Sequence, residues 1–119
     1  MEFTDPSIAA LLDTTNDDAL DALDFGVIGM TTTGRVARYN AFESRCAGLG
    51  AARVLGKHFF TEVAPCTNNY LVASRFEECA SLDELVPYVF TLRMRPRKVE
   101  LRLVKTAGSD KQYLLVRNR

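Results

Sequence analysis

Apolar and polar residues alternate with the period of a β-strand in the last third of the chain. One apolar run continues to residue 94, a second covers residues 99–103, and a third covers residues 112–117 after a turn at residues 107–110. The apolar positions of the first two runs are Val86, Tyr88, Phe90, Leu92, Met94, Val99, Leu101 and Leu103. The pattern predicts three consecutive strands.

The first part of the chain has a different pattern. Cap-like residues precede short apolar segments at residues 7–12, where Pro6 is expected at the first helical position, and at residues 16–23. Residues 25–31 and 35–39 predict a β-hairpin around a turn at Thr33-Gly34. Residues 40–78 predict short helical pieces interrupted by Gly48, Gly50, Gly56 and Pro65, the last of them a helix over residues 69–78.

This order of elements predicts an α+β domain in which five antiparallel strands cover one side of a pocket. A length of 119 residues suits one domain with its own core. We expect residues 1–24 to form an N-terminal helical cap and residues 25–119 to form the core.

Charge is distributed unevenly although its sum is zero. Residues 1–30 carry seven acidic and no basic side chains, whereas residues 93–119 carry nine basic side chains against Glu100 and Asp110. A basic end is compatible with nucleic-acid binding. Because the charges balance, we favour docking of the acidic start against the basic end, and expect no nucleic-acid partner.

Cysteine usage and hydropathy restrict the remaining classes. The longest aliphatic runs, at residues 9–12 and 114–116, are far shorter than the roughly 18 residues of a membrane span, and the acidic start is unlike a signal peptide. We therefore expect a soluble cytoplasmic protein. Cys46, Cys66 and Cys79 are odd in number without C-x-x-C spacing, and His58 is the sole histidine, which argues against disulfides and zinc.

Two resemblances follow from longer motifs. The stretch GRVARYNAFESRCAGLGAARVLGKHFF, residues 34–60, resembles the PAS fold, which hosts many cofactors and often none. The stretch GKHFFTEVAPCT, residues 56–67, resembles the photoactive yellow proteins, PAS-fold blue-light receptors whose cysteine carries p-coumaric acid as a thioester. The second resemblance extends to YNAFE at residues 39–43 and FTLRMRPRKV at residues 90–99, and it implies covalent attachment at Cys66.

The chemistry of Cys66 is consistent with that role. A thiolate attacks activated acyl groups at neutral pH and forms a reversible thioester, and a helix beginning just after Cys66 would favour the thiolate. The alternative is that Cys66 is a small buried hydrophobic residue, which is the usual role of a free cysteine and the one we assign to Cys46 and Cys79.

The resemblance also implies that Tyr39 and a protonated Glu43 hold the phenolic oxygen of the chromophore. Burial beside a phenolate would keep Glu43 neutral. The alternative is a capping box, in which Glu43 returns to the backbone of Asn40. Tyr39 is equally compatible with a plain core position.

Further site positions are implied by the resemblance alone. Pocket walls and supporting positions are assigned to Phe59, Ala64, Pro65, Thr67, Phe90 and Met94. Met94 matches a methionine that assists thermal return in the family. Ala47 and Leu49 replace a threonine and an arginine of the best-known member, so we expect a shifted absorption maximum or a changed dark recovery.

We therefore expect a non-enzymatic blue-light receptor, a monomer or weak dimer with a downstream signalling protein as its partner. Proton transfer from Glu43 is expected to leave a buried carboxylate and to detach the cap. One alternative is a chromophore-free PAS interaction module. Another is a cysteine enzyme that uses His58, for which no Cys/His/Asp constellation is readable.

Overall fold

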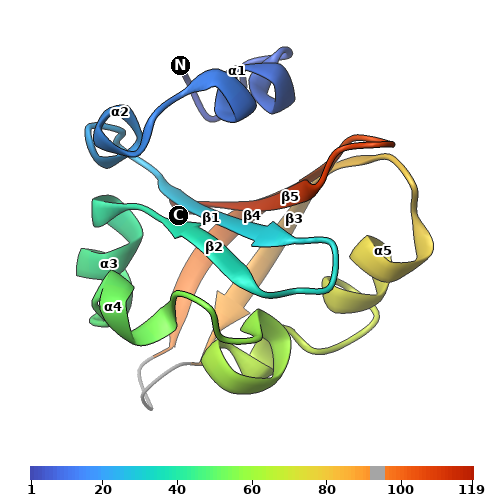
Figure 1. The fold of residues 1–119 in the computed structure, drawn as a ribbon. Helices are drawn as coiled ribbons and strands as arrows, with labels where there is room; N and C mark the ends of the chain where they lie inside the picture. Colours follow the sequence, from blue (N-terminus) through green and yellow to red (C-terminus); the bar gives the residue numbers. More distant parts are fainter. Residues whose placement is uncertain (92–95) are drawn as a thin grey trace.

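The computed structural model describes residues 1–91 and 96–119 and contains a five-stranded antiparallel sheet in the order β2-β1-β5-β4-β3 (Figure 1). The strands are β1 (Gly26–Thr31), β2 (Val36–Tyr39), β3 (Leu82–Phe90), β4 (Arg97–Lys105) and β5 (Lys111–Asn118). The helices are α1 (Ile8–Thr14), α2 (Asp17–Asp21), α3 (Ala41–Ala47), α4 (Ala51–Val54), α5 (Ala73–Glu78), the π-helical η1 (Phe59–Val63) and the 3₁₀ turn η2 (Pro65–Thr67). The predicted α+β class and the five antiparallel strands are confirmed.

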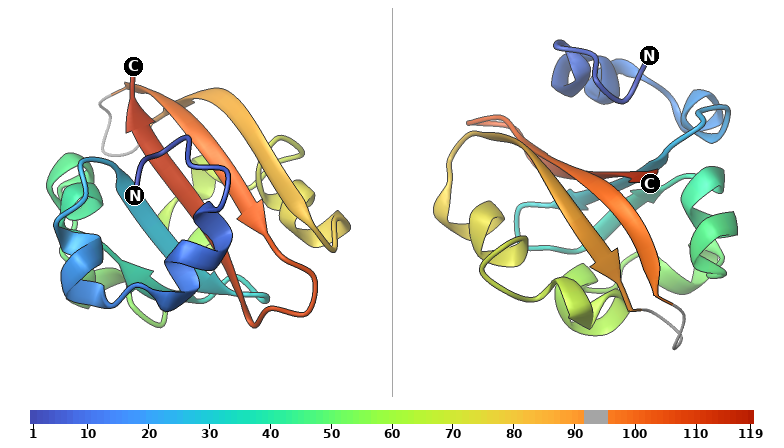
Figure 2. Two further views of the ribbon diagram at one scale, coloured as in Figure 1. Left: turned by 90° about the horizontal axis from the view of Figure 1, so that it is seen from above. Right: turned by 180° about the vertical axis from the view of Figure 1, so that it is seen from behind.

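Helices cover both faces of the sheet, and strand alternation separates two apolar clusters. α1 and α2 lie over one face, called here the outer face, while α3, α4, α5, η1 and η2 lie over the inner face (Figures 1 and 2). The inner cluster includes Ile28, Phe59, Phe90, Leu101 and Leu114 among its buried residues. Neighbouring residues along each strand point to opposite faces, so a single sheet separates the chemistry of the helical crossing from that of the N-terminus.

Residues 1–24, the cap, contribute Phe3, Ile8, Leu12 and Leu20 to a second cluster on the outer face. Their partners on the remainder of the chain are Phe25, Val27, Val104, Tyr113 and Leu115. The rings of Phe3 and Phe25 meet edge to face with centroids 5.7 Å apart. The cap is thus held by apolar burial over β1, β5 and β4.

The basic end of the chain does contact the acidic start, but mainly through groups other than carboxylates. Arg102 donates to the main-chain oxygens of Phe3 and Asp5, at 2.8 Å each. The guanidinium of Arg117 lies over the ring of Phe3, 4.4 Å from its centroid. The expected docking therefore occurs, with main-chain oxygens and an aromatic ring as the acceptors.

The structure corrects two predicted helix starts. The first helix begins at Ile8 rather than at Pro6, because the Asp5 carboxylate accepts from the Ser7 amide and stabilises a turn. The helix expected over residues 69–78 begins only at Ala73. The Asn69 side chain accepts from the Leu71 and Val72 amides and stabilises another turn.

β3 begins at Leu82, which is earlier than the apolar pattern indicated. Even-numbered residues of β3 face the inner side as predicted, and Phe90 is the last of them within the described residues. Leu92 and Met94, expected on the same face, lie outside the described residues. Pro87 is tolerated within β3 because β3 is an edge strand.

Cys46, Cys66 and Cys79 are free thiols. Within residues 1–91 and 96–119, no helix has the length and apolarity needed to cross a membrane. The same residues contain no group of three or more side chains suited to hold a metal ion.

Substitutions of two leucines can test which part of the outer face the cap covers. Leu115 and Leu85 both lie opposite Arg102 on neighbouring strands, yet Leu115 is 0% exposed and Leu85 is 54% exposed. Leu115→Ala is expected to lower the free energy of unfolding by about 2–5 kcal/mol through the cavity it leaves. Leu85→Ala is the control, with an expected change within about 0.5 kcal/mol. Equal losses in urea denaturation would contradict the assigned cover.

Candidate functional site

Cys66 lies in the 3₁₀ turn η2, whose shape is set by the residues around it. Pro65 opens the turn and restricts the residue before it, Ala64, which has φ −133° and ψ 71°. Thr67 closes the turn through its hydroxyl, which donates to the Ala64 carbonyl at 2.7 Å. Thr67 and Ala64 are buried, Pro65 is exposed, and Cys66 is half-buried. The thiol is therefore held in a defined turn at the edge of the core.

β3 braces this turn from the opposite side. The Tyr88 hydroxyl donates to the carbonyl oxygen of Cys66, and the Asn69 side chain donates to the same oxygen at 3.2 Å. Asn69 and the Tyr88 hydroxyl also contact each other at 2.6 Å. Sequence analysis assigned Tyr88 only to the inner face and missed both residues as supports of the cysteine turn. A tyrosine that points inward needs a hydrogen-bond partner for its hydroxyl, and this need was the indication that the sequence offered for Tyr88.

The helix that was expected to favour a Cys66 thiolate is not adjacent to it. α5 begins at Ala73, after a turn that separates it from η2. The influence of a helix dipole falls off within the first turn of the helix. That argument for the reactivity of Cys66 was wrong.

Asn40 fixes the start of α3 through a fully used, buried side chain. Its Oδ1 accepts from the amides of Glu43 and Val27, at 3.2 and 2.9 Å. Its Nδ2 donates to the carbonyl oxygens of Leu20 and Phe25, both at 2.9 Å. The predicted capping box is only half formed, since the amide of Asn40 donates to Val27. The Glu43 carboxylate points elsewhere.

That carboxylate is buried and paired with Arg97. Glu43 is 2% exposed, and its oxygens accept from Arg97 Nη2 at 3.1 Å and Nη1 at 3.2 Å. A Cβ on Gly26 would lie 2.4 Å from Glu43 Oε1, so only glycine leaves space there. Burial raises the pKa of Glu43 above its ordinary 4.5, although the hydrogen bonds and charge of Arg97 act to lower it.

Sequence analysis missed Arg97 as part of this site. Arg97 shares the inward alternation of Val99 and Leu101 in β4, and an arginine at an inward position needs a buried acceptor. That acceptor lies on α3, far away in sequence, so alternation signals the need for a partner and not its identity.

Most of the predicted wall residues share the inner cluster. Tyr39 and Leu49 are partly buried and pack against it, as does Cys66. Phe59, Ala64 and Phe90 are buried members of it. Leu49 accepts from the Ser44 hydroxyl at 2.8 Å through its carbonyl, and Ala47 is the last residue of α3. Met94 lies outside the described residues.

His58 packs against the β1–β2 hairpin. A Cβ added at Gly34 would lie 2.8 Å from His58 Nε2, so the imidazole ring lies close to the hairpin there. The ring of Phe60 also lies near the His58 ring, with centroids 6.0 Å apart. These contacts involve no cysteine, so nothing in them favours a cysteine enzyme.

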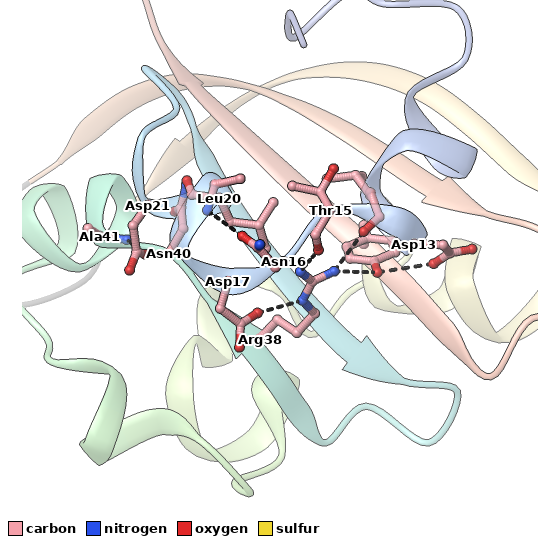
Figure 3. Close-up of polar contacts among 12 residues, drawn as sticks. Asp13, Thr15, Asn16, Asp17, Leu20, Asp21, Arg38, Asn40 and Ala41 are labelled. Atoms are coloured by element: carbon pink, nitrogen blue, oxygen red, sulfur yellow. Dashed lines mark hydrogen bonds and ion pairs between the residues drawn. The ribbon is translucent and has the colours of Figure 1, made fainter.

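Arg38 extends from β2 into the loop between α1 and α2 (Figure 3). It donates to Asp17 at 3.0 Å and to the carbonyl oxygens of Leu12, at 2.7 Å, and Thr15. It also contacts the Tyr113 hydroxyl at 3.1 Å. Arg38 directly precedes Tyr39 on β2, so a residue that holds the cap is adjacent in sequence to a residue of the candidate site.

Comparison with known proteins identifies the family. No protein-family model matches the chain. The chain is 35% identical over 105 residues to the photoactive yellow protein of Halochromatium salexigens, which covers 86% of this chain and 84% of that protein. It is 34% identical to the photoactive yellow protein of Rhodothalassium salexigens, covering 85% and 83%. The chain belongs to the photoactive yellow protein family.

Solved structures agree with this assignment. The photoactive yellow protein domain of the sensor histidine kinase Ppr from Rhodospirillum centenum is 36% identical, with a TM-score of 0.84 over 92% of this chain and 98% of that domain. A PAS domain of an HTR-like protein from Haloarcula marismortui, 16% identical with a TM-score of 0.68, shows the same fold. The predicted membership of a PAS-fold photoreceptor family is confirmed.

The raised pKa of Glu43 predicts a specific pH dependence of stability in this family member. Between pH 4.5 and that raised pKa, the folded protein binds more protons than the unfolded chain, so the free energy of unfolding falls as pH rises. Glu43→Gln is expected to lack this contribution. The lowered pKa of Asp83, caused by its hydrogen bonds from Arg102, has the opposite sign and is present in both proteins. Parallel curves from urea denaturation across this pH range would contradict the assignment.

Proposed function

We propose that this chain is a blue-light photoreceptor that carries p-coumaric acid as a thioester on Cys66. The observation that carries the proposal is that a half-buried thiol, Cys66, and Tyr39 pack against the same apolar cluster, while a buried carboxyl group, Glu43, lies on α3 over the same face of the sheet. A buried acid is costly without a function or a partner. Arg97 is the partner of Glu43 here, and the resemblance to the photoactive yellow proteins implies a phenolic chromophore beside this acid.

The residues present suit a phenolic thioester. Cys66 offers the sulfur, in a turn whose carbonyl is anchored by Tyr88 and Asn69. Phe59 and Phe90 offer apolar walls beside Tyr39, and Tyr39 and a protonated Glu43 would offer donors for a phenolic oxygen. When bound, the chromophore supplies absorption of blue light and trans-to-cis isomerisation. The residues of the chain carry out every other step of the response.

Glu43 is the group whose loss of a proton is expected to destabilise the fold after isomerisation. In the protonated form its carboxyl group donates a hydrogen bond, and burial favours that form. Loss of the proton leaves a carboxylate in a site that is 2% exposed. The effective penalty for burying an ion is several kcal/mol, comparable with the stability of a small domain. Arg97 pairs with that carboxylate and reduces this penalty, so a restrained local opening is the expected consequence.

Asn40 provides the connection from Glu43 to the cap. One amide group accepts from the Glu43 main chain and donates to Leu20 in the cap. A shift of the first turn of α3 therefore disturbs the hydrogen bond to α2. The Ala41 amide also donates to Asp21 of α2, at 2.8 Å (Figure 3). Both contacts support the cap, rather than the sheet, as the element that responds.

The cysteines provide the test of chromophore attachment. Purified protein treated with an activated ester or anhydride of p-coumaric acid is expected to gain one p-coumaroyl group and a visible absorption band that bleaches in blue light. Cys46→Ala and Cys79→Ala are matched controls that should retain the band, and Cys66→Ala should lose it. A wild-type protein that stays colourless would refute the photoreceptor proposal.

Arg38 provides a test of the cap as the responsive element. Arg38→Gln removes the charged hydrogen bond to the Leu12 carbonyl of α1. One such bond contributes about 1.5–3 kcal/mol, so amide hydrogen exchange in α1 should accelerate about 10- to 100-fold. Arg35→Gln is the control, since Arg35 pairs with Glu62, is half-exposed and lies on the same hairpin. Unchanged protection of α1 in Arg38→Gln would show that apolar burial alone holds the cap.

A chromophore-free PAS interaction module is the second candidate. Leu85 and Val89 are 54% and 41% exposed on the outer side of the edge strand β3, next to the area that the cap covers. Such an apolar strip suits a protein partner better than it suits solvent. In either case we infer a signalling protein as the partner, no nucleic acid, and a monomeric or weakly dimeric chain.

A further inference from the structure

The ion pair between Glu43 and Arg97 places a permanent positive charge in the inner layer. Arg97 is the first residue of β4, and both of its terminal nitrogens donate to the carboxylate, at 3.1 and 3.2 Å. The side chains are 17% and 2% exposed for Arg97 and Glu43. A guanidinium stays protonated in proteins, so this charge does not disappear when Glu43 gains a proton.

The guanidinium is held from two other strands, β5 and β3. Its Nε donates to Asn118 Oδ1 on β5, at 2.9 Å, and its carbon lies 5.8 Å from the ring centroid of Phe90 on β3. The Glu43 carboxylate in turn lies so close to Gly26 of β1 that no side chain fits there. Both ends of the ion pair are therefore confined, and Arg97 has little freedom to turn toward solvent.

We propose that Arg97 is a positioning residue that supplies the counter-charge of the site and pairs with whichever nearby acid is ionised. The proposal rests on the proposed function. With a phenolate beside Glu43, two acids share one proton beside one fixed cation. Wherever that proton resides, one negative charge remains and Arg97 balances it. Loss of the proton from Glu43 then moves the negative charge without creating an unpaired one.

This arrangement changes the expected response of the chain. An ionised Glu43 that keeps its guanidinium partner costs less than an isolated buried carboxylate. The state with ionised Glu43 is therefore stabilised, and the opening around α3 is restrained. Among the described residues, Glu43 is also faced by Asn40 at the start of α3 and by Gly26 on β1, and Arg97 is the charged group that acts on its carboxyl.

The test uses the full chain without chromophore. The side-chain carboxyl carbon of Glu43 is followed by NMR as pH is varied, in protein with ¹³C-labelled glutamate, and Glu43→Gln identifies the resonance. Arg97→Gln is expected to raise the midpoint of the Glu43 titration by about 1–3 pH units, the usual effect of removing an adjacent opposite charge. An unchanged midpoint would overturn the proposal.

Arg117→Gln is a closely matched control. Arg117 also pairs with a glutamate, Glu100, and lies over a phenylalanine ring, that of Phe3, but on the outer face. Its loss should leave the Glu43 midpoint unchanged. If Arg97→Gln does not fold, the NMR signals of the Arg97 guanidinium nitrogens are followed against pH in wild-type protein instead. They are expected to shift with the same midpoint as the Glu43 carboxyl carbon, and a different midpoint would overturn the proposal.

The two proposals fail separately. A protein that remains colourless after treatment with activated p-coumaric acid contradicts the photoreceptor function, and it leaves a shifted Glu43 midpoint in Arg97→Gln intact as a property of the chain. A normal photoresponse together with an unchanged midpoint contradicts only the role of Arg97.

Discussion

The buried amide of Asn40 is the interaction on which the arrangement of this structure depends. Its four hydrogen bonds go to Glu43 of α3, to Val27 of β1, and to the carbonyl oxygens of Leu20 in the cap and of Phe25 just before β1. Because every donor and acceptor of the amide is used, no other side chain of similar size replaces it. Asn40 sets where α3 starts, and the start of α3 sets where the Glu43 carboxylate points.

The two faces of the sheet separate two kinds of stability. The inner face holds aromatic and aliphatic side chains beside a cysteine, a tyrosine and one buried ion pair. The outer face is covered by short helices, which are marginal in isolation and depend on tertiary contacts. Because these helices are short and depend on tertiary contacts, a perturbation at Glu43 is expected to be absorbed at the cap. The proposed light response needs such an element, stable in the dark and low in its free energy of opening.

Three arginines are central to this balance, and each has a different task. Arg38 and Arg102 attach the cap mainly by donating to main-chain oxygens, which keeps those oxygens satisfied under the helices. Arg97 instead neutralises a carboxylate inside the fold. The planar guanidinium suits all three positions, because it binds several acceptors at fixed angles and keeps its charge when partly buried.

Patterns within short stretches of the sequence were sufficient to predict much of the fold. Alternation predicted the faces of β3 and β4, the Thr33-Gly34 turn predicted the hairpin, and the motif around Cys66 indicated the family that the comparisons confirmed. These features depend on residues close together in sequence. The late start of α5 was missed because the Asn69 side chain competes with the helix for the same amides.

The tertiary structure decided which polar groups meet. The sequence indicates that Glu43 is either a cap or a chromophore ligand, and it indicates that Arg97 points inward, but their pairing joins residues brought together only by the sheet. The brace from Tyr88 to Cys66 and the bonds from Arg38 to the cap are of the same kind. Periodicity determines which side of an element is buried. Long-range hydrogen bonds depend on how the faces are packed, and that geometry is a property of the whole fold.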